Sequence, residues 1–220
     1  LGLELARAFA GRGDTVIGGC RNPDDASELQ AVTPHVHAVD MGDEKSITAF
    51  VAAVGDRPVD VVINNAGIDA RNLGAADGER DVLLQPYDHF IGQITVNTWG
   101  PLALVRALLP NLCAATNGRV VNVSSQVGSM EVGATMGRDL GYSVSKAALN
   151  MVTVKLAMRL RGEGVTAIAL HPGYLKTDMG GASAAMEPAD AAAAIAALVD
   201  GLSIDDSGSF KRWDGTTHPW

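Results

Sequence analysis

Hydrophobic and polar residues follow two different periods along this chain, and the change of period marks the expected elements. Residues 3–13 (LELARAFAGRG) place apolar side chains at helical spacing and end in glycine, which predicts an amphipathic helix. Residues 15–19 (TVIGG) form a short apolar run that predicts a buried strand. Helices and strands are expected to alternate in this way to the end of the chain.

The remaining elements continue this alternation. Further strands are predicted at residues 35–40, 59–67, 118–125, 165–170 and 208–213. Further helices are predicted at residues 43–55, 87–115, around Tyr142 as far as 162–164, and 187–200. Pro101 and Pro110 are expected to interrupt the helix at 87–115, because proline lacks the backbone N–H that a helix uses.

The predicted strands are apolar and β-branched on both faces, as parallel strands covered by helices on each side are. Repeated strand–helix units require βαβ crossovers, so we predict a three-layer, Rossmann-type doubly wound parallel α/β sheet. The 220 residues suit one such domain, and no linker or repeat marks a second. Ligands bind such sheets at the carboxyl ends of the strands, where the chain places Arg21, Asp40, residues 64–67, Ser125 and residues 172–173.

Composition narrows the class of protein. With 47% hydrophobic and 19% charged residues, the chain has an ordinary globular composition. The net charge of -8 and the lack of a dense Lys/Arg cluster argue against a nucleic-acid partner. Cys20 and Cys113 lie far apart, which predicts reduced thiols and a cytoplasmic location, and His35 and His37 lack a third metal ligand. No apolar run of the length of a transmembrane helix is present, so no membrane partner is expected.

Tyr142 and Lys146 lie four residues apart on the Ala-rich segment GYSVSKAALN, which is predicted to be helical. This spacing places a phenol and an ammonium one turn apart on the same helix face. A free phenol, with a pKa of about 10, is a poor acid or base near neutrality. A nearby ammonium favours the phenolate, so we expect Lys146 to lower the pKa of Tyr142. Taken alone, the pair is also typical of a half-exposed helix face.

Five short motifs in a fixed order extend this observation. They are NNAG (64–67), VNTWG with Asn97, VNVSSQVGS (121–129), YSVSK (142–146) and HPGYLKTDM (171–179). Together they resemble the short-chain dehydrogenase/reductase family over essentially the whole chain. The final residues, SGSFKRWDGTTHPW, further resemble the tail of the branch that contains C-factor and the Sniffer-like carbonyl reductases.

The resemblance implies a catalytic tetrad. Tyr142 would donate a proton to a carbonyl oxygen, or accept one from an alcohol, and Lys146 would also bind the nicotinamide ribose. Ser125 would hold the substrate oxygen; it is preferred to Ser124 because the family's serine lies three residues before a glycine. Asn97 would anchor a water that links the lysine to solvent. In isolation, the serine could instead satisfy a backbone group at the strand end, and the asparagine could cap a distorted turn.

Family members begin with a strand and a Gly-rich turn that brings a pyrophosphate to a helix N-terminus. Alignment with this pattern makes Gly2 the last glycine of the turn, so the first strand and the earlier glycines are missing from the sequence. Without that central strand, two neighbouring strands would stay unpaired on one side. The single domain at residues 1–220 is therefore expected to be N-terminally incomplete.

Cofactor choice depends on the end of the second strand of the family pattern. NAD-specific relatives place an Asp or Glu there for the ribose 2′-hydroxyl, whereas this chain has Cys20 and Arg21. Arg21 could pair with a 2′-phosphate, so NADP(H) is favoured over NAD(H); a solvated surface charge is the alternative. Asp24 and Asp25 follow too late and are predicted to start a helix.

Other residues are implied to line the cofactor. Asp40 would bind the adenine amino group, with Met41 beside it; a helix cap is the alternative, although Asp43 is better placed for that. Thr177 would contact the nicotinamide carboxamide, or would cap the following segment. The remaining implied contacts are Gly2, Asn65, Ala66, Gly67, Pro172 and Gly173.

Substrate recognition is assigned to residues 126–140 and 174–186, which flank the cleft in this fold. Their small, Gly-rich and methionine-containing composition, Met136 included, indicates an open apolar pocket for a ketone or aldehyde; the methionines could instead fill gaps in the core. Residues 68–85 are predicted to form a solvated loop.

These features predict an NADPH-dependent carbonyl reductase that acts on a small-molecule carbonyl or alcohol. One alternative is a nucleotide-binding signalling or scaffold protein of the same fold, in which Tyr142→Phe would change nothing. Another is a dehydratase or epimerase that uses the same Tyr/Lys pair without net consumption of cofactor. A homodimer or homotetramer would form if the Leu/Ala/Val-rich helices at 87–115 and around Tyr142 pair across a two-fold axis; coverage of that face within one chain is the alternative.

Overall fold

The computed structural model describes residues 1–135, 137–181 and 183–220, and a parallel sheet lies at its centre. The strands within these ranges are β1 (Gly18–Cys20), β2 (Val36–Ala38), β3 (Val61–Asn64), β4 (Arg119–Val123), β5 (Thr166–His171) and β6 (Phe210–Arg212). Strands β3, β4, β5 and β6 pair in that order, and β1 pairs with β2, all in parallel. Each strand overlaps a segment predicted to be a strand. Within the described residues β1 and β3 each have a neighbour on one side only.

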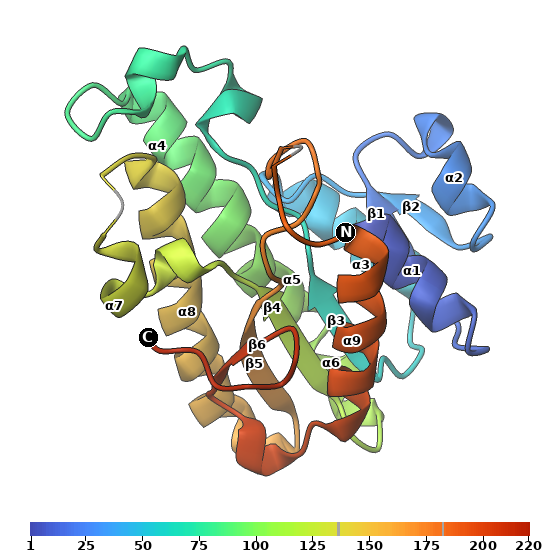
Figure 1. The fold of residues 1–220 in the computed structure, drawn as a ribbon. Coiled ribbons are helices and arrows are strands. Elements are labelled where there is room, and N and C mark those ends of the chain that lie inside the picture. Colours follow the sequence, from blue (N-terminus) through green and yellow to red (C-terminus); the bar gives the residue numbers. More distant parts are fainter. Residues whose placement is uncertain (136, 182) are drawn as a thin grey trace.

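Helices cover both faces of the sheet. They are α1 (Gly2–Ala10), α2 (Ser27–Gln30), α3 (Glu44–Val54), α4 (Tyr87–Ile94), α5 (Gly100–Ala107), α6 (Leu109–Ala114), α7 (Met130–Gly133), α8 (Leu140–Leu160) and α9 (Pro188–Gly201). Helices α1 and α9 pack together on one face, and α3, α5 and α8 cover the other (Figure 1). This is the predicted three-layer doubly wound α/β fold. In the described part of the chain, no helix has both the length and the apolar character needed to span a membrane.

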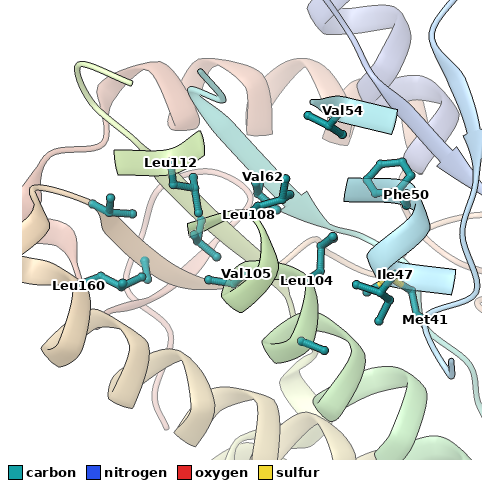
Figure 2. Close-up of a cluster of buried hydrophobic side chains, with 14 of the residues drawn as sticks. Met41, Ile47, Phe50, Val54, Val62, Leu104, Val105, Leu108, Leu112 and Leu160 are labelled. Carbon is teal, nitrogen blue, oxygen red and sulfur yellow. The ribbon is translucent and has the colours of Figure 1, made fainter. Parts of the chain in front are cut away.

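Neighbouring residues of β4 enter two different hydrophobic clusters, because successive side chains of a strand point to opposite faces. Val120 packs with side chains of α3, α5 and α8 in the cluster that Figure 2 shows. Val121 packs on the other face with Leu5 of α1 and Ile195 of α9. Both valines are fully buried. With both faces of the sheet covered, the ends of the strands are the parts that a ligand can reach.

The helical run at 87–115 is not interrupted at Pro101, where an interruption was predicted. The backbone stays helical through Pro101, which lies in the first turn of α5, directly after a π-helical turn at Thr95–Trp99. Proline is tolerated in a first turn, where its missing N–H is least needed. The run breaks at Leu108 instead, and Pro110 lies in the first turn of α6. The π-helical turn carries Asn97, and such turns are frequent at functional sites.

Residues 68–85 are largely exposed, as the sequence predicts for a solvated loop, but they contain two short helical turns that it does not predict. Asp69 is 7% exposed and caps a 3-10 helix at Ala70–Leu73, and a second 3-10 helix covers Asp77–Arg80. Asn72 completes the cap, since its Oδ1 accepts a hydrogen bond from Asp69 N at 2.9 Å. An Asp followed three residues later by an amide or acid is a capping signal, and it was available in the sequence. These local bonds, together with the ion pairs described below, order the segment next to the start of α8.

Candidate active site

The two serines that follow β4 have different surroundings. Ser124 is 2% exposed, and its Oγ donates to Asn150 Oδ1 of α8 at 2.6 Å. Ser125 is half-buried and begins a short 3-10 helix, where its Oγ accepts from Val127 N at 3.4 Å. The first serine therefore joins β4 to α8. The second keeps a hydroxyl at the strand end, which supports its choice as the residue that binds the substrate oxygen.

Helix α8 brings Tyr142 and Lys146 together one turn apart. The Lys146 side chain is 3% exposed, and its Nζ donates to Val123 O at 2.8 Å. The same Nζ lies 5.7 Å from the centre of the Tyr142 ring. Gly128 permits this close packing of α8, because a Cβ there would lie 2.7 Å from the carbonyl carbon of Lys146. The ammonium thus lies against the phenol ring and has no contact with bulk water.

Burial dominates the acid–base properties of this pair. It raises the pKa of Tyr142 to about 12, although the Ser125 hydroxyl acts against this rise, while Asp69 and Asp139 add to it. Burial also lowers the pKa of Lys146 to about 8. The pKa of Tyr142 in the ligand-free protein thus lies above its ordinary value, and not below it as expected from the neighbouring ammonium, because loss of hydration is the largest cause of the shift. Near neutral pH the phenol keeps its proton, as a proton donor must.

Asn97 joins the loop after β3 to α8. Its Oδ1 accepts from Ile68 N at 2.8 Å, and its Nδ2 donates to Ile68 O at 2.7 Å and to Ser145 Oγ at 2.9 Å. The side chain is fully buried. These partners lie outside the turn that carries Asn97, so the simple turn-capping alternative does not describe it.

Gly67 lies between these groups. A Cβ at this position would lie 3.3 Å from Lys146 Nζ and 3.5 Å from Asn97 Oδ1. The missing side chain leaves room beside a buried ammonium, which is where a ligand can approach the backbone closely. The structure thus brings Asn97, Tyr142 and Lys146 together with Ser125 at the carboxyl ends of β3 and β4.

Gly2 begins α1, the helix whose N-terminus is implied to approach the pyrophosphate. A Cβ on Gly2 would lie 2.6 Å from Asn65 Nδ2, so a larger residue would require the Asn65 side chain to move where this helix meets the end of β3. Asn64 turns inward, and its Nδ2 donates to Asn122 Oδ1 at 2.7 Å in a structural contact. Asn65 and Ala66 are more exposed at the strand end, where a cofactor can reach them.

Arg21 is exposed directly after β1, at the carboxyl end of that strand. Asp24 and Asp25 lie in the first turn of a 3-10 helix at Pro23–Asp25, as predicted from their late position. Cys20 is half-buried and is a free thiol. An arginine, and not a carboxylate, therefore occupies the place from which the 2′ position of an adenine ribose would be read.

Asp40 and Met41 follow β2 and differ in exposure. Asp40 is exposed, and its Oδ1 accepts from Gly42 N at 2.8 Å. Asp43 is the cap of α3, as predicted, since its Oδ1 accepts from Lys45 N at 3.0 Å. The Met41 side chain belongs to the hydrophobic core, so its backbone is the part that remains for a cofactor contact.

The segment after β5 begins with a turn at Pro172 and Gly173. Gly173 has a φ of 93°, a left-handed conformation that favours glycine, and a Cβ there would lie 3.1 Å from Trp213 Cδ1. Thr177 Oγ1 accepts from Gly180 N at 3.2 Å. In the ligand-free protein this hydroxyl therefore caps the following turn, which was the alternative to a cofactor contact.

The two predicted substrate segments, residues 126–140 and 174–186, lie before and after Tyr142 and Lys146 along the chain. Met130 in the first is 77% exposed, and Tyr174 in the second is 52% exposed. Met136 lies outside the described residues. Arg71 Nη2 donates to Met179 O at 2.7 Å, so residues 68–85 also contact the second substrate segment. The sequence did not predict this contact. Asp69 and Arg71, two residues apart, are typical of a solvent-exposed loop and gave no sign that Arg71 reaches the second segment.

His37 packs edge-on against Phe50, with ring centres 6.3 Å apart. His35 N donates to Thr33 Oγ1 at 3.2 Å on the same strand edge. Within residues 1–135, 137–181 and 183–220, no group of three His, Cys, Asp or Glu side chains could hold a metal ion.

Comparison with known proteins agrees with this geometry. The short chain dehydrogenase family model matches residues 1–188. C-signal from Myxococcus xanthus is 39% identical over 172 residues, which cover 78% of this chain and 99% of that protein. A 1-hydroxy-2-glutathionyl-2-methyl-3-butene dehydrogenase from Rhodococcus sp. (strain AD45) is 33% identical over 225 residues, which cover 99% of this chain and 93% of that protein.

Solved structures give the same result. The NADPH-bound carbonyl reductase from chicken fatty liver superposes with a TM-score of 0.88 at 29% identity, over 99% of this chain and 94% of that chain. Carbonyl reductase Sniffer of D. melanogaster superposes with a TM-score of 0.83 at 28% identity, over 100% of this chain and 95% of that chain. The chain therefore belongs to the short-chain dehydrogenase/reductase family, in the branch of C-signal and Sniffer, and is an NAD(P)-dependent oxidoreductase.

Proposed function

We propose that the protein is an NADPH-dependent carbonyl reductase, which reduces a ketone or aldehyde to an alcohol or catalyses the reverse reaction, within one cofactor-binding domain of residues 1–220. The buried Lys146 ammonium against the Tyr142 ring carries this proposal. Burial alone accounts for its lowered pKa, and its hydrogen bond is to a backbone carbonyl, not to a carboxylate. No carboxylate of residues 1–135, 137–181 and 183–220 forms an ion pair with Lys146. A buried charge without a counter-ion costs free energy that a purely structural position would avoid, so it points to a functional role.

The tetrad residues divide the work of the reaction. Ser125 donates a hydrogen bond to the substrate carbonyl oxygen, and Tyr142 gives that oxygen its proton. Lys146 stabilises the phenolate that remains. The nicotinamide cofactor supplies the hydride when bound, and the protein contributes position and electrostatics. Asn97 holds the loop after β3 against α8 and so keeps these groups at a constant separation.

The described residues fit a nicotinamide dinucleotide. An ammonium has three N–H donors, and the contact of Lys146 with Val123 O leaves donors for a ribose hydroxyl. Gly67 leaves room beside them. Arg21, exposed at the end of β1, suits a 2′-phosphate, and for this reason we favour NADP(H) over NAD(H). The similarity to an NADPH-bound carbonyl reductase supports the same choice.

The substrate is proposed to be a small molecule with an apolar body and one reactive carbonyl or alcohol group. It would lie between residues 126–140 and 174–186, which follow Ser125 and Gly173 directly. Exposed Met130 and half-buried Met179 in these segments support an apolar, adaptable pocket.

The first test is turnover of the purified protein with NADPH, and with NADH in parallel, against a panel of ketones and aldehydes. We expect NADPH consumption with at least one carbonyl compound. Tyr142→Phe removes the proton donor but keeps the ring, and is expected to lower kcat about 10²–10⁴-fold. Tyr87→Phe is the matched control, because Tyr87 is 75% exposed on α4.

The other outcomes separate the alternatives. Unchanged turnover in Tyr142→Phe would show that the tetrad is wrongly assigned. Cofactor binding without turnover on any carbonyl would favour the signalling alternative, which the name of the C-signal relative brings forward. A tightly retained cofactor with no net consumption of NADPH would favour a dehydratase or epimerase.

We also propose a homodimer or homotetramer that uses the outer face of α8. Met151 and Met158 on this helix are 57% and 71% exposed. Met151 also lines a shallow hollow between α5 and α8, together with Leu102, Val152, Leu156 and the one charged residue of the lining, Lys155. Light scattering is expected to show an oligomer that Met151→Glu dissociates. A monomeric wild-type protein at all concentrations would contradict this proposal.

A further inference from the structure

The first turn of α8 is held by residues from a distant part of the chain. Asp139 N donates to Arg80 O at 2.9 Å, and Gly141 N donates to Gln85 Oε1 at 2.7 Å. The side chain of Asp139, which precedes the helix, caps none of its N–H groups. The segment after β3 therefore takes the place of a local helix cap.

Arg80 and Asp139 also form a forked ion pair. Arg80 Nε lies 2.6 Å from Asp139 Oδ1, and Nη2 lies 2.7 Å from Oδ2. The two side chains are 22% and 26% exposed, so the pair is partly shielded from solvent. A forked pair fixes the relative orientation of the two side chains as well as bringing opposite charges together. Arg159 and Glu163, near the far end of α8, form only a single exposed contact at 3.2 Å.

Asp139 has a backbone conformation that needs support. Its φ of 60° and ψ of 47° are left-handed, a region uncommon for residues with a Cβ, although aspartate adopts it more often than most of them. Such a conformation persists where neighbouring contacts hold it, and the two bonds from Arg80 are such contacts. Tyr142 lies three residues further on, in the same turn, so the position of its hydroxyl depends on how this turn begins. Misplacement of a reacting group by about 1 Å can cost roughly 10²-fold in rate.

The ion pair also affects charge near the phenol. The charged groups that act on the Tyr142 phenol are Asp69, paired with Arg71, and Asp139, paired with Arg80, and Lys146 lies beside the ring. The elements packed against α8 also carry titratable groups: Tyr87, Asp88 and His89 on α4, His171 on β5, and Arg161 and Glu163 just after α8. An aspartate that loses its arginine would oppose the phenolate form more strongly.

We propose that Arg80 is a positioning residue for the reaction: it holds Asp139 and the first turn of α8, and thereby sets both the place and the ionisation of the Tyr142 hydroxyl. This inference rests on the proposed role of Tyr142. Arg80 acts through Asp139 and α8, without contact to the substrate.

The test compares Arg80→Ala with the wild type and with Arg159→Ala, which removes an exposed, ion-paired arginine from α8 itself. Arg80→Ala is expected to lower kcat about 10- to 100-fold, while KM for NADPH stays within about twofold, because the cofactor contacts lie elsewhere. Hydrogen–deuterium exchange of residues 140–145 is expected to accelerate in Arg80→Ala alone. Arg159→Ala is expected to match the wild type in all three measurements.

The pH profile separates positioning from a merely structural effect. In the direction of alcohol oxidation the rate needs the phenolate, so Arg80→Ala is expected to shift the rising limb to higher pH, by roughly half a unit to one unit. The double variant Arg80→Ala/Asp139→Asn removes the carboxylate as well. We expect it to reverse the pH shift while the loss of kcat remains.

The proposal would be overturned if Arg80→Ala had the same kcat, the same pH profile and the same hydrogen–deuterium exchange as the wild type. If Tyr142→Phe is inactive in the same assays, only the positioning role fails; if Tyr142→Phe also keeps full activity, the proposed function fails with it. Should Arg80→Ala not fold, Arg80→Lys takes its place, since it keeps the charge but loses the forked geometry. It is expected to show the lower kcat and faster exchange without the pH shift, and wild-type values would again refute the role.

Discussion

The proposed catalytic and cofactor halves of the site are built differently. At the ends of β3 and β4, the polar side chains of Asn97, Ser124 and Lys146 are buried, and each has a specific partner. At the ends of β1 and β2, Arg21 and Asp40 are exposed to solvent. Groups that transfer a proton must be in place before the reaction, because reorganisation during it raises the barrier. Groups that recognise a charged cofactor can become ordered when the cofactor binds. This ordering lowers the affinity for the cofactor but does not slow the chemical step.

Loss of activity and loss of stability are expected to separate at the two serines that follow β4. Ser125→Ala should lower kcat about 10²–10³-fold, as loss of one donor to a developing oxyanion does, with little change in the free energy of unfolding. Ser124→Ala should instead lower the free energy of unfolding by about 1–2 kcal/mol, because Asn150 loses its buried partner. Steady-state kinetics and denaturant unfolding of both variants measure this. The opposite pattern would transfer the catalytic role to Ser124.

Lys146→Met tests whether burial of the Lys146 ammonium lowers the free energy of unfolding. The pKa of Lys146 in the folded protein, about 8, lies below that of the unfolded chain, so between the two values the unfolded chain binds more protons. The free energy of unfolding of the wild type should therefore rise from pH 8 to pH 10, and that of Lys146→Met should not. At pH 7 the variant should be more stable by roughly 1–3 kcal/mol and inactive. A variant that is less stable and has the same pH dependence would contradict this account.

Arg21→Ala probes the cofactor half. It should weaken NADPH binding about tenfold, equivalent to 1.4 kcal/mol, and leave NADH binding and the stability of the ligand-free protein unchanged. Thermal-shift titrations with both nucleotides measure this, and Arg159→Ala serves as the control for loss of an exposed positive charge. Equal weakening of both nucleotides would show that Arg21 does not read the 2′-phosphate.

The smallest effect is expected at His171, which lies outside both halves. Burial first, then His218 and Arg212, lowers its pKa to about 4, and its ring packs edge-on against His218 at 5.3 Å. Below the ordinary pKa of about 6.5 the unfolded chain takes up a proton that the folded protein does not. The free energy of unfolding should therefore fall by about 1 kcal/mol between pH 6.5 and pH 5.5, and His171→Phe should flatten this fall. Denaturant curves at both pH values decide it.

Much of the fold could be predicted from the sequence because its signals are local. The predicted helix at 43–55 corresponds to α3 with its cap at Asp43, and each strand overlaps an apolar run. Hydrophobic periodicity, caps and the Tyr142–Lys146 spacing are encoded within a few residues, so one sequence suffices to read them. The order of the motifs located the family in the same way.

The tertiary structure alone decided the rest. The order of residues 68–85, and the use of Arg80 to hold the start of α8, depend on contacts between residues about sixty positions apart. The direction of the pKa shift of Tyr142 depends on how completely the fold removes water from the phenol. Local patterns along the chain specify which elements form and which chemical groups are available. Burial and long-range pairing set the energies of those groups, because both are sums over neighbours that only the folded chain brings together.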